Sequence, residues 1–196
     1  MTSWQLESTG GTAIRTQVPE LGRLRIEIFR DWPYLYEGTL DYERHYFETY
    51  ARCPDSLVVT ARADGKAIGA TTALPLSAAA ADMQAPFIAV GWSLEETLYF
   101  GESVVQKAWR GQGLGVAFFE AREVHARRLG LRHCVFCAVE RPADHPARPP
   151  GYIGNEAFWS HRGYRRQPHL HCTFDWCDVG ETQPSTHTMT FWLKTF

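Results

Sequence analysis

Residues 99–129 constrain the fold of this chain more than any other stretch, because they predict a strand, a glycine-rich turn and a helix in direct succession. The segment 99–105 is aromatic and β-branched, which is typical of a strand. Glycines follow at alternate positions 111, 113 and 115. Apolar residues then recur at helical spacing over 114–129, with most of the charged residues outside that stripe.

This turn has the properties of a phosphate-binding site. The first backbone N–H groups of a helix have no partner within the helix and form the positive end of its dipole. Glycines allow a ligand to approach those groups because they carry no Cβ. We therefore expect a cradle for phosphate or pyrophosphate. It would consist of Arg110, Gly111, Gln112, Gly113, Leu114, Gly115 and Val116.

Two common phosphate-binding turns fit this segment poorly. A P-loop requires Lys followed by Ser or Thr after its glycines, and that pair is missing here. A dinucleotide fingerprint requires Gly or Ala where this chain has Val116, although Glu140 follows where a ribose-binding acid would lie. That fingerprint also usually opens the first βα unit, whereas about half of this chain precedes the turn. A nucleotide-binding oxidoreductase is thus the weaker alternative.

Composition and net charge limit the kinds of protein that this chain can be. A chain of 196 residues with 44% hydrophobic residues is long enough for one domain with a full core, and we expect a single domain over residues 1–196. The net charge of −2 argues against nucleic-acid binding. No apolar run has the length of a membrane span, and the N-terminal residues lack a secretory signal, so a cytoplasmic location is expected.

The rest of the chain predicts alternating short strands and helices. The first half is expected to contain a strand, two helices, a hairpin around Asp64-Gly65, an Ala-rich connection and a short helix. These lie at 12–17, 19–30, 40–52, 56–63 with 66–74, 77–86 and 87–96. After the central helix we expect a strand, a Pro-rich loop, a short helix and an antiparallel strand pair. These lie at 132–140, 141–154, 155–162, and 169–176 with 188–194.

The motif Arg110-x-x-Gly113-x-Gly115 resembles the Q/R-x-x-G-x-G/A motif of the GNAT superfamily of acyl-CoA N-acyltransferases. The expected order β-α-α-β-β-β-α-β-α-β-β is similar to that family over nearly the whole chain. The resemblance implies an α+β fold, in which helices flank a central mixed sheet. It also implies transfer of the acetyl group of acetyl-CoA to a primary amine on a small cationic molecule. An acyl-CoA-binding module without catalysis is the alternative, and a homodimer is left open.

The resemblance also implies cofactor-binding residues outside the turn. The backbone groups of Ser103 and Val105 would pair with the pantetheine arm, and the Val105 N–H would polarise the thioester carbonyl. Asn155 would contact the same arm. An Asn at the start of a helix can equally serve only as its N-cap.

Glu102 is the acidic residue nearest the expected transfer point, and we predict that it acts as general base. Strict alternation opposes this role, because Tyr99, Ser103 and Val105 would share one face and Glu102 would point to the other. A β-bulge in this strand would reverse that orientation. Tyr99, acting through an ordered water, is the next candidate for the base.

The general acid is missing from its usual place. In the family a tyrosine protonates the departing thiolate, and Trp159 stands at that position here. An indole N–H is only a hydrogen-bond donor. We therefore choose Tyr152, in the Gly-flanked loop before the short helix, over Tyr164, which is expected to pack in the core. His145 and His161 remain further candidates.

Acidic and aromatic residues mark the expected acceptor side. In the family the first two helices and their loop line the acceptor site, and here this segment is rich in both kinds of residue. They are Asp31, Glu37, Asp41, Glu43, Trp32, Tyr34 and Tyr36. Such a set suits a cationic amine, through charge and cation–π contact, and equally a solvated loop with core aromatics.

No metal site is expected. Cys134 and Cys137 lie within a predicted strand, where a spacing of three places them on opposite faces. In the second Cys/His cluster, His169 and His171 share a face of a predicted strand and Cys172 does not. Ordinary strand residues explain both groups better than a zinc site.

Overall fold

The computed structural model describes residues 3–196 and has one mixed sheet of seven strands in the order β1-β2-β3-β4-β5-β7-β6. Only β4 and β5 run parallel, and every other neighbouring pair is antiparallel. The strands are β1 (Gln5–Thr9), β2 (Leu57–Ala63), β3 (Lys66–Pro75), β4 (Thr97–Val105), β5 (His133–Val139), β6 (Arg165–Trp176) and β7 (Ser185–Thr195).

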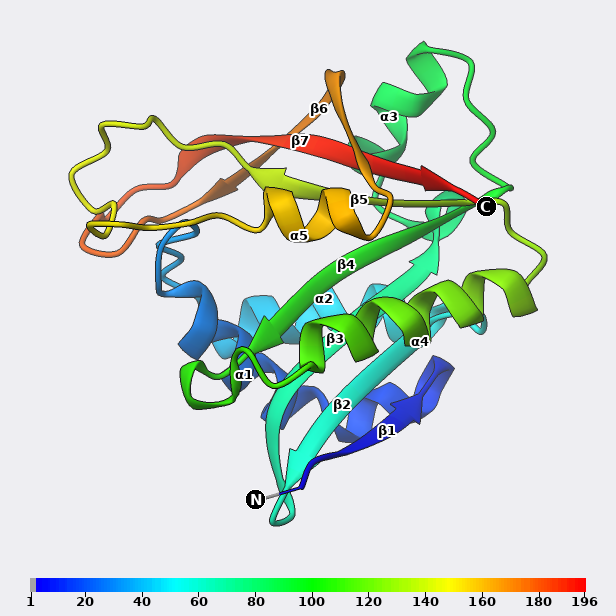
Figure 1. Ribbon diagram of the computed structural model, residues 1–196, viewed down its shortest axis with the longest axis horizontal. Helices are drawn as coiled ribbons and strands as arrows, with labels where there is room; N and C mark the ends of the chain where they lie inside the picture. Colours follow the sequence, from blue (N-terminus) through cyan, green and yellow to red (C-terminus); the bar gives the residue numbers. More distant parts are fainter. Residues whose placement is uncertain (1–2) are drawn as a thin grey trace.

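Helices cover both faces of the sheet (Figure 1). One face packs its apolar side chains against α1, α2 and α3, and the other packs them against α4 and α5. The helices are α1 (Val18–Phe29), α2 (Leu40–Arg52), α3 (Ala81–Ala89), α4 (Leu114–Arg128) and α5 (Glu156–His161). The expected mixed α+β architecture is therefore confirmed. None of these helices in the described chain has the length and apolar character needed to cross a bilayer.

The central strands β4 and β5 separate soon after they begin. They pair only at Thr97, Leu98 and Tyr99 of β4, and the two strands then diverge (Figure 1). Over the described residues, β4 keeps its pairing with β3 as far as Val105 but has no strand on its other edge from position 100 onward. This open edge is what positions the candidate site.

A β-bulge in β4 sets the direction of its side chains. Thr71 of β3 pairs with Ser103, and Ala73 pairs with Phe100, so three steps along β4 match two along β3. The extra residue breaks the alternation of faces. Tyr99 and Val104 consequently lie in the same core cluster although five positions separate them. The condition under which Glu102 would turn towards the α1–α2 face is met.

The long helices and the hairpin agree with the sequence predictions. The second helix spans Leu40–Arg52 as expected, and the Thr39 hydroxyl accepts a hydrogen bond from Tyr42 N–H at its start. The hairpin turns at Asp64 and Gly65 with φ values of 49° and 75°, as an Asp-Gly turn requires. Gly130, at φ 72°, follows the end of α4 as a C-terminal cap.

Two sequence predictions were wrong. The first strand is Gln5–Thr9, and residues 11–16 form a 3-10 helix instead. Gly11, at φ 55°, turns the chain away from the sheet, and Ile14 fills the core from a helical turn. The helix expected at 87–96 lies instead at Ala81–Ala89, where it begins within the Ala-rich stretch, and the chain turns at Gly91 with φ 69° just after it. Alanine has the highest helix propensity of the amino acids, and the interpretation of this run as a connection gave that property too little weight.

Candidate active site

The open edge of β4 offers free backbone donors. Gln106 N–H donates to the Ile68 carbonyl in β3, at 2.9 Å. Because amide groups alternate along a strand, the N–H groups of Val105 and Ser103 point away from β3, into the gap towards β5. This is the orientation that the predicted contacts with a pantetheine arm require.

The glycine turn at the end of β4 opens directly into α4. Gly111 and Gly113 have φ values of 76° and 87°, which favour glycine, and Gly113 is the N-cap of α4. No acceptor among the described residues takes a hydrogen bond from the backbone N–H groups of residues 111–116, whereas Ala117 N–H bonds to the Gly113 carbonyl. A Cβ added at Gly111 or Gly113 would meet no atom within 4 Å. The turn thus offers open space lined by unpaired donors, which fits a pyrophosphate.

Three of the predicted cofactor-binding side chains, two from the turn and one from the start of α5, have different surroundings. The Arg110 side chain donates to the Val105 carbonyl at 3.1 Å, and Gln112 donates to the Ala108 carbonyl at 3.0 Å. Asn155 is the N-cap of α5, but its side chain makes no capping hydrogen bond. Its amide is therefore free for another partner.

Glu102 lies on the α1–α2 face and is 6% exposed. Its Oε2 atom accepts hydrogen bonds from the Tyr46 hydroxyl and from Thr72 Oγ1 at 3.0 Å, and it pairs with Arg25 Nη1 at 2.9 Å. Its Oε1 atom is buried and has no hydrogen-bond partner within residues 3–196. A buried carboxylate oxygen without a hydrogen bond lowers the stability of the fold, so we expect this atom to bind a ligand.

Arg25 joins two carboxylates. Its Nε bonds to Glu43 Oε2 at 2.6 Å, and its guanidinium lies over the Tyr46 ring at 3.9 Å. Burial opposes its charge, but Glu102, Tyr46 and Glu43 outweigh that effect and raise the pKa of Arg25. Burial also raises the pKa of Glu43, against the pull of Arg25. With all three side chains ionised, the cluster carries one net negative charge.

A pocket lies beside this cluster, where β4 and β5 part. Tyr99 and Gly101 line it from β4, and Cys137 lines it from β5. Its other walls are mostly aromatic, and they come from α1, the α1–α2 loop, α2 and β6. These side chains are Phe29, Tyr34, Tyr36, Tyr42, Tyr46, Phe174 and Trp176. The pocket therefore faces the point at which an acyl group held along β4 would end.

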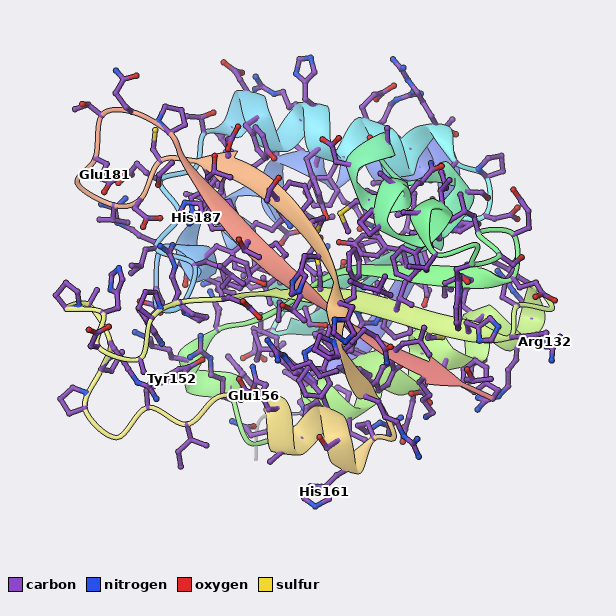
Figure 2. All side chains as sticks on the ribbon, turned by 90° about the horizontal axis from the view of Figure 1, so that it is seen from above. Arg132, Tyr152, Glu156, His161, Glu181 and His187 are labelled. Carbon is purple, nitrogen blue, oxygen red and sulfur yellow. The ribbon has the colours of Figure 1, made fainter. Side chains whose placement is uncertain are left out.

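Tyr152 lies on the loop that leads into α5 (Figure 2). Its ring meets Trp32 edge-on at 6.0 Å, and the Arg148 guanidinium lies 5.9 Å from its centroid. Burial, together with Glu156, raises the pKa of Tyr152, so its hydroxyl keeps its proton at neutral pH. Within the described chain, Tyr152 is not among the residues that line the aromatic pocket.

The other tyrosine is a core residue, and the unusual tryptophan is partly buried and packs against the core. Tyr164 is 1% exposed and donates to Glu123 Oε1 at 3.2 Å, as expected for a packing role. Trp159 packs at 5.1 Å from both Phe136 and Trp192. An indole thus fills this part of the core in place of the tyrosine that the family resemblance led us to expect.

The structure separates the acids of the acceptor segment. Asp31, Glu37 and Asp41 form exposed ion pairs with Lys107, Arg30 and Arg44. Glu43 alone among the four is buried. Sequence reasoning missed the wall from β6 and the pairing of Arg25 with both carboxylates. The position of Arg25 on the apolar face of α1 was the signal in the sequence that could have predicted this pairing.

The cysteine pair follows the predicted geometry. Cys134 lies in the cluster under α4, and Cys137 lies in the cluster under α1 and α2, so the two occupy opposite faces. Across residues 3–196 no group of three His, Cys, Asp or Glu side chains is arranged to hold a metal ion.

Comparisons with known proteins agree with this geometry. The sequence model of the Acetyltransferase (GNAT) family matches residues 23–149, from α1 through the glycine turn and β5. A search of curated proteins returns no match.

Solved structures share the fold. An N-acetyltransferase from Staphylococcus aureus Mu50 is 14% identical with a TM-score of 0.62 over 99% of both chains. An acetyltransferase from Thermus thermophilus is 15% identical with a TM-score of 0.62 over 100% of both chains. A ribosomal-protein-alanine N-acetyltransferase from Brucella melitensis is 14% identical with a TM-score of 0.62, over 97% of this chain and 99% of that one. The chain belongs to the GNAT acetyltransferase family.

Proposed function

We propose that the protein is an N-acetyltransferase that moves the acetyl group of acetyl-CoA directly to a primary amine on a small cationic molecule. The observation that carries the proposal is Glu102, which lines the pocket at the point where β4 and β5 part and whose buried Oε1 atom has no hydrogen-bond partner within the described residues. An ammonium group is the natural donor to such an oxygen.

The residues present fit acetyl-CoA, which supplies an acetyl group activated as a thioester. The free N–H groups of residues 111–116 would hold the pyrophosphate. Ser103 and Val105 would pair with the pantetheine arm along the open edge of β4, and the free amide of Asn155 would contact it. The Val105 N–H would also stabilise the carbonyl oxygen as it gains charge.

Two side chains then transfer protons: Glu102, which lines the pocket, and Tyr152, on the loop before α5 (Figure 2). Glu102 holds the ammonium and accepts one proton from it, which frees the nitrogen lone pair. The C–N bond forms, the nitrogen loses its second proton to solvent, the C–S bond breaks, and Tyr152 gives a proton to the sulfur before solvent restores its own. Holding both reactants in one geometry supplies much of the rate. Glu102 is the residue on which this mechanism depends most.

The test measures amine-dependent release of CoA thiol by wild type, Glu102→Gln and Glu96→Gln. Glu96 immediately precedes β4 and pairs with Arg132 at the surface, so it is a matched control. We expect Glu102→Gln to lower kcat/KM for the amine by about 10²–10⁴-fold, since both an anchor and a proton acceptor are lost. The melting-temperature shift with acetyl-CoA should survive in both variants.

Two results would contradict the proposal. Full activity of Glu102→Gln would make this carboxylate structural. A wild-type protein that is stabilised by acetyl-CoA, but releases no thiol with any amine, would instead be an acyl-CoA-binding module. The missing family tyrosine at Trp159 is the feature that favours this second reading.

A further inference from the structure

The side chains that line the pocket restrict the kind of acceptor more than the negative charge of Glu102 does. Eight of the thirteen lining residues are aromatic, and they come from both sides of the gap between β4 and β5. Phe29 and Tyr34 pack together at 4.4 Å, and Tyr34 and Trp176 at 6.2 Å. Flat aromatic walls favour a flat apolar body, through edge and face contacts with its ring.

The part of the pocket formed by Tyr34 and Trp176 is held in place by the buried ion pair between Arg141 and Asp178. Arg141 donates twice to the Asp178 carboxylate, at 2.6 and 2.7 Å, and once to the Tyr34 carbonyl, at 2.6 Å. The Trp176 indole N–H donates to both Tyr34 O and Asp178 Oδ1, at 3.1 and 3.0 Å. Tyr34 and Trp176 are therefore fixed before any ligand arrives, so the pocket is preformed.

The pocket offers one free anionic acceptor. Glu102 is the only acid among the residues that line it, and its Oε2 atom is already taken by Arg25, Tyr46 and Thr72. Its Oε1 atom has no partner among the described residues, so one ammonium group would satisfy it. A second ammonium on the same molecule would find no free carboxylate oxygen among the described lining residues, and cation–π contact with the walls would offset only part of its lost hydration.

We infer that the acceptor is an arylalkyl primary monoamine, in which one ammonium group is joined by a short chain to an aromatic ring. The ammonium donates to Glu102 Oε1, and the ring lies among Tyr34, Phe174 and Trp176. This inference rests on the proposed function and narrows its acceptor from cationic amines in general to one class.

The experiment compares kcat/KM for three amines of similar length at saturating acetyl-CoA: 2-phenylethylamine, n-hexylamine and 1,6-diaminohexane. We expect kcat/KM for phenylethylamine to exceed that for hexylamine by about tenfold, since its ring makes edge and face contacts with the aromatic walls that an alkyl chain does not make. The diamine should be the poorest of the three. Equal or better turnover of the diamine would overturn the inference while the proposed function stands. No turnover of any amine would count against the proposed function itself.

A wall variant tests the ring contact separately. Phe174 lines the pocket from β6, and Phe174→Leu keeps an apolar side chain while removing the ring. We expect this variant to lower kcat/KM for phenylethylamine several-fold and to leave that for hexylamine within about twofold. Phe196→Leu, at the exposed end of the chain, is the control and should change neither. An equal fall for both amines in Phe174→Leu, with an unchanged melting temperature, would refute recognition of an aromatic body.

Discussion

At the scale of the residue, Gly101 is what allows Glu102 to reach its partners. A Cβ at this position would come within 2.0 Å of the Tyr50 hydroxyl and 2.4 Å of Thr72 Oγ1. Only a glycine lets the bulged strand lie this close to α2 and β3. The bulge then turns the next side chain, Glu102, towards Arg25 and Tyr46. One missing side chain therefore sets the direction of the proposed base.

Tyr152 carries the proposed acid function, and Tyr152→Phe tests it. We expect turnover to fall by up to about 10²-fold where thiolate release limits the rate, because the variant has no proton to give. The affinity for acetyl-CoA should change little. Tyr164→Phe is the control: it loses a buried hydrogen bond to Glu123, so it should lower the melting temperature and spare turnover. Steady-state kinetics and thermal unfolding of both variants measure these effects. Unchanged turnover of Tyr152→Phe would show that solvent, and not Tyr152, protonates the departing thiolate.

At the scale of the element, α4 has two glycines with similar geometry at its two ends. Gly113 precedes the helix with φ 87°, and Gly130 follows it with φ 72°. A Cβ at either position would meet no atom within 4 Å. Alanine at each site should therefore cost a similar amount of stability, about 1 kcal/mol, because the left-handed conformation disfavours it.

Only the N-terminal glycine should matter for the cofactor. We expect Gly113→Ala to weaken binding of CoA by at least about tenfold, since its methyl group would occupy the space in front of the free N–H groups. Gly130→Ala should bind CoA as wild type does. Isothermal titration with CoA measures both affinities. If the two variants bind equally well, the pyrophosphate does not lie on this turn.

At the scale of the whole molecule, a buried histidine links α4 to the segment before β2. His125 is 5% exposed, its Nε2 lies 2.8 Å from the Asp55 carbonyl, and its Nδ1 lies 3.1 Å from Arg128 Nη2. In the neutral ring Nε2–H donates and Nδ1 accepts, so both contacts are satisfied. Burial, joined by Arg128, lowers the pKa of His125 despite the opposing contact with Asp55.

The fold should therefore lose stability in mild acid. Above pH 6.5, the ordinary pKa of histidine, His125 is neutral in both states and contributes no pH dependence. As the pH falls below that value, His125 binds a proton in the unfolded chain but stays neutral in the folded chain. The free energy of unfolding then decreases by up to about 1.4 kcal/mol per pH unit for one histidine. Urea unfolding at pH 7.5, 6.5 and 5.5 measures this decrease.

His125→Gln isolates the contribution of this residue. The variant should be less stable than wild type at pH 7.5, since its packing and hydrogen bonds change. Its loss of stability between pH 6.5 and 5.5 should be smaller, with the remainder due to other groups such as His133 and His187, whose pKa values are also lowered chiefly by burial. An identical loss in variant and wild type would exclude His125 as a source.

The sequence by itself determined the features that depend on neighbours in the chain. The Asp64-Gly65 turn, the helix at Leu40–Arg52 and the glycine turn into α4 follow from backbone conformation, capping and hydrophobic spacing, which act over a few residues. The free N–H groups at residues 111–116 follow from the same local geometry.

Only the tertiary structure decided how the acceptor pocket is built. Strict alternation along the strand predicted that Glu102 points to the wrong face. The bulge that reverses this orientation arises from the pairing of β4 with β3. Arg25 meets Glu43 and Glu102 because α1, α2 and β4 converge, and Trp176 reaches the pocket from more than 70 positions further along the chain. Contacts between residues so far apart in sequence are fixed by long-range packing and strand pairing, for which local sequence patterns carry no information.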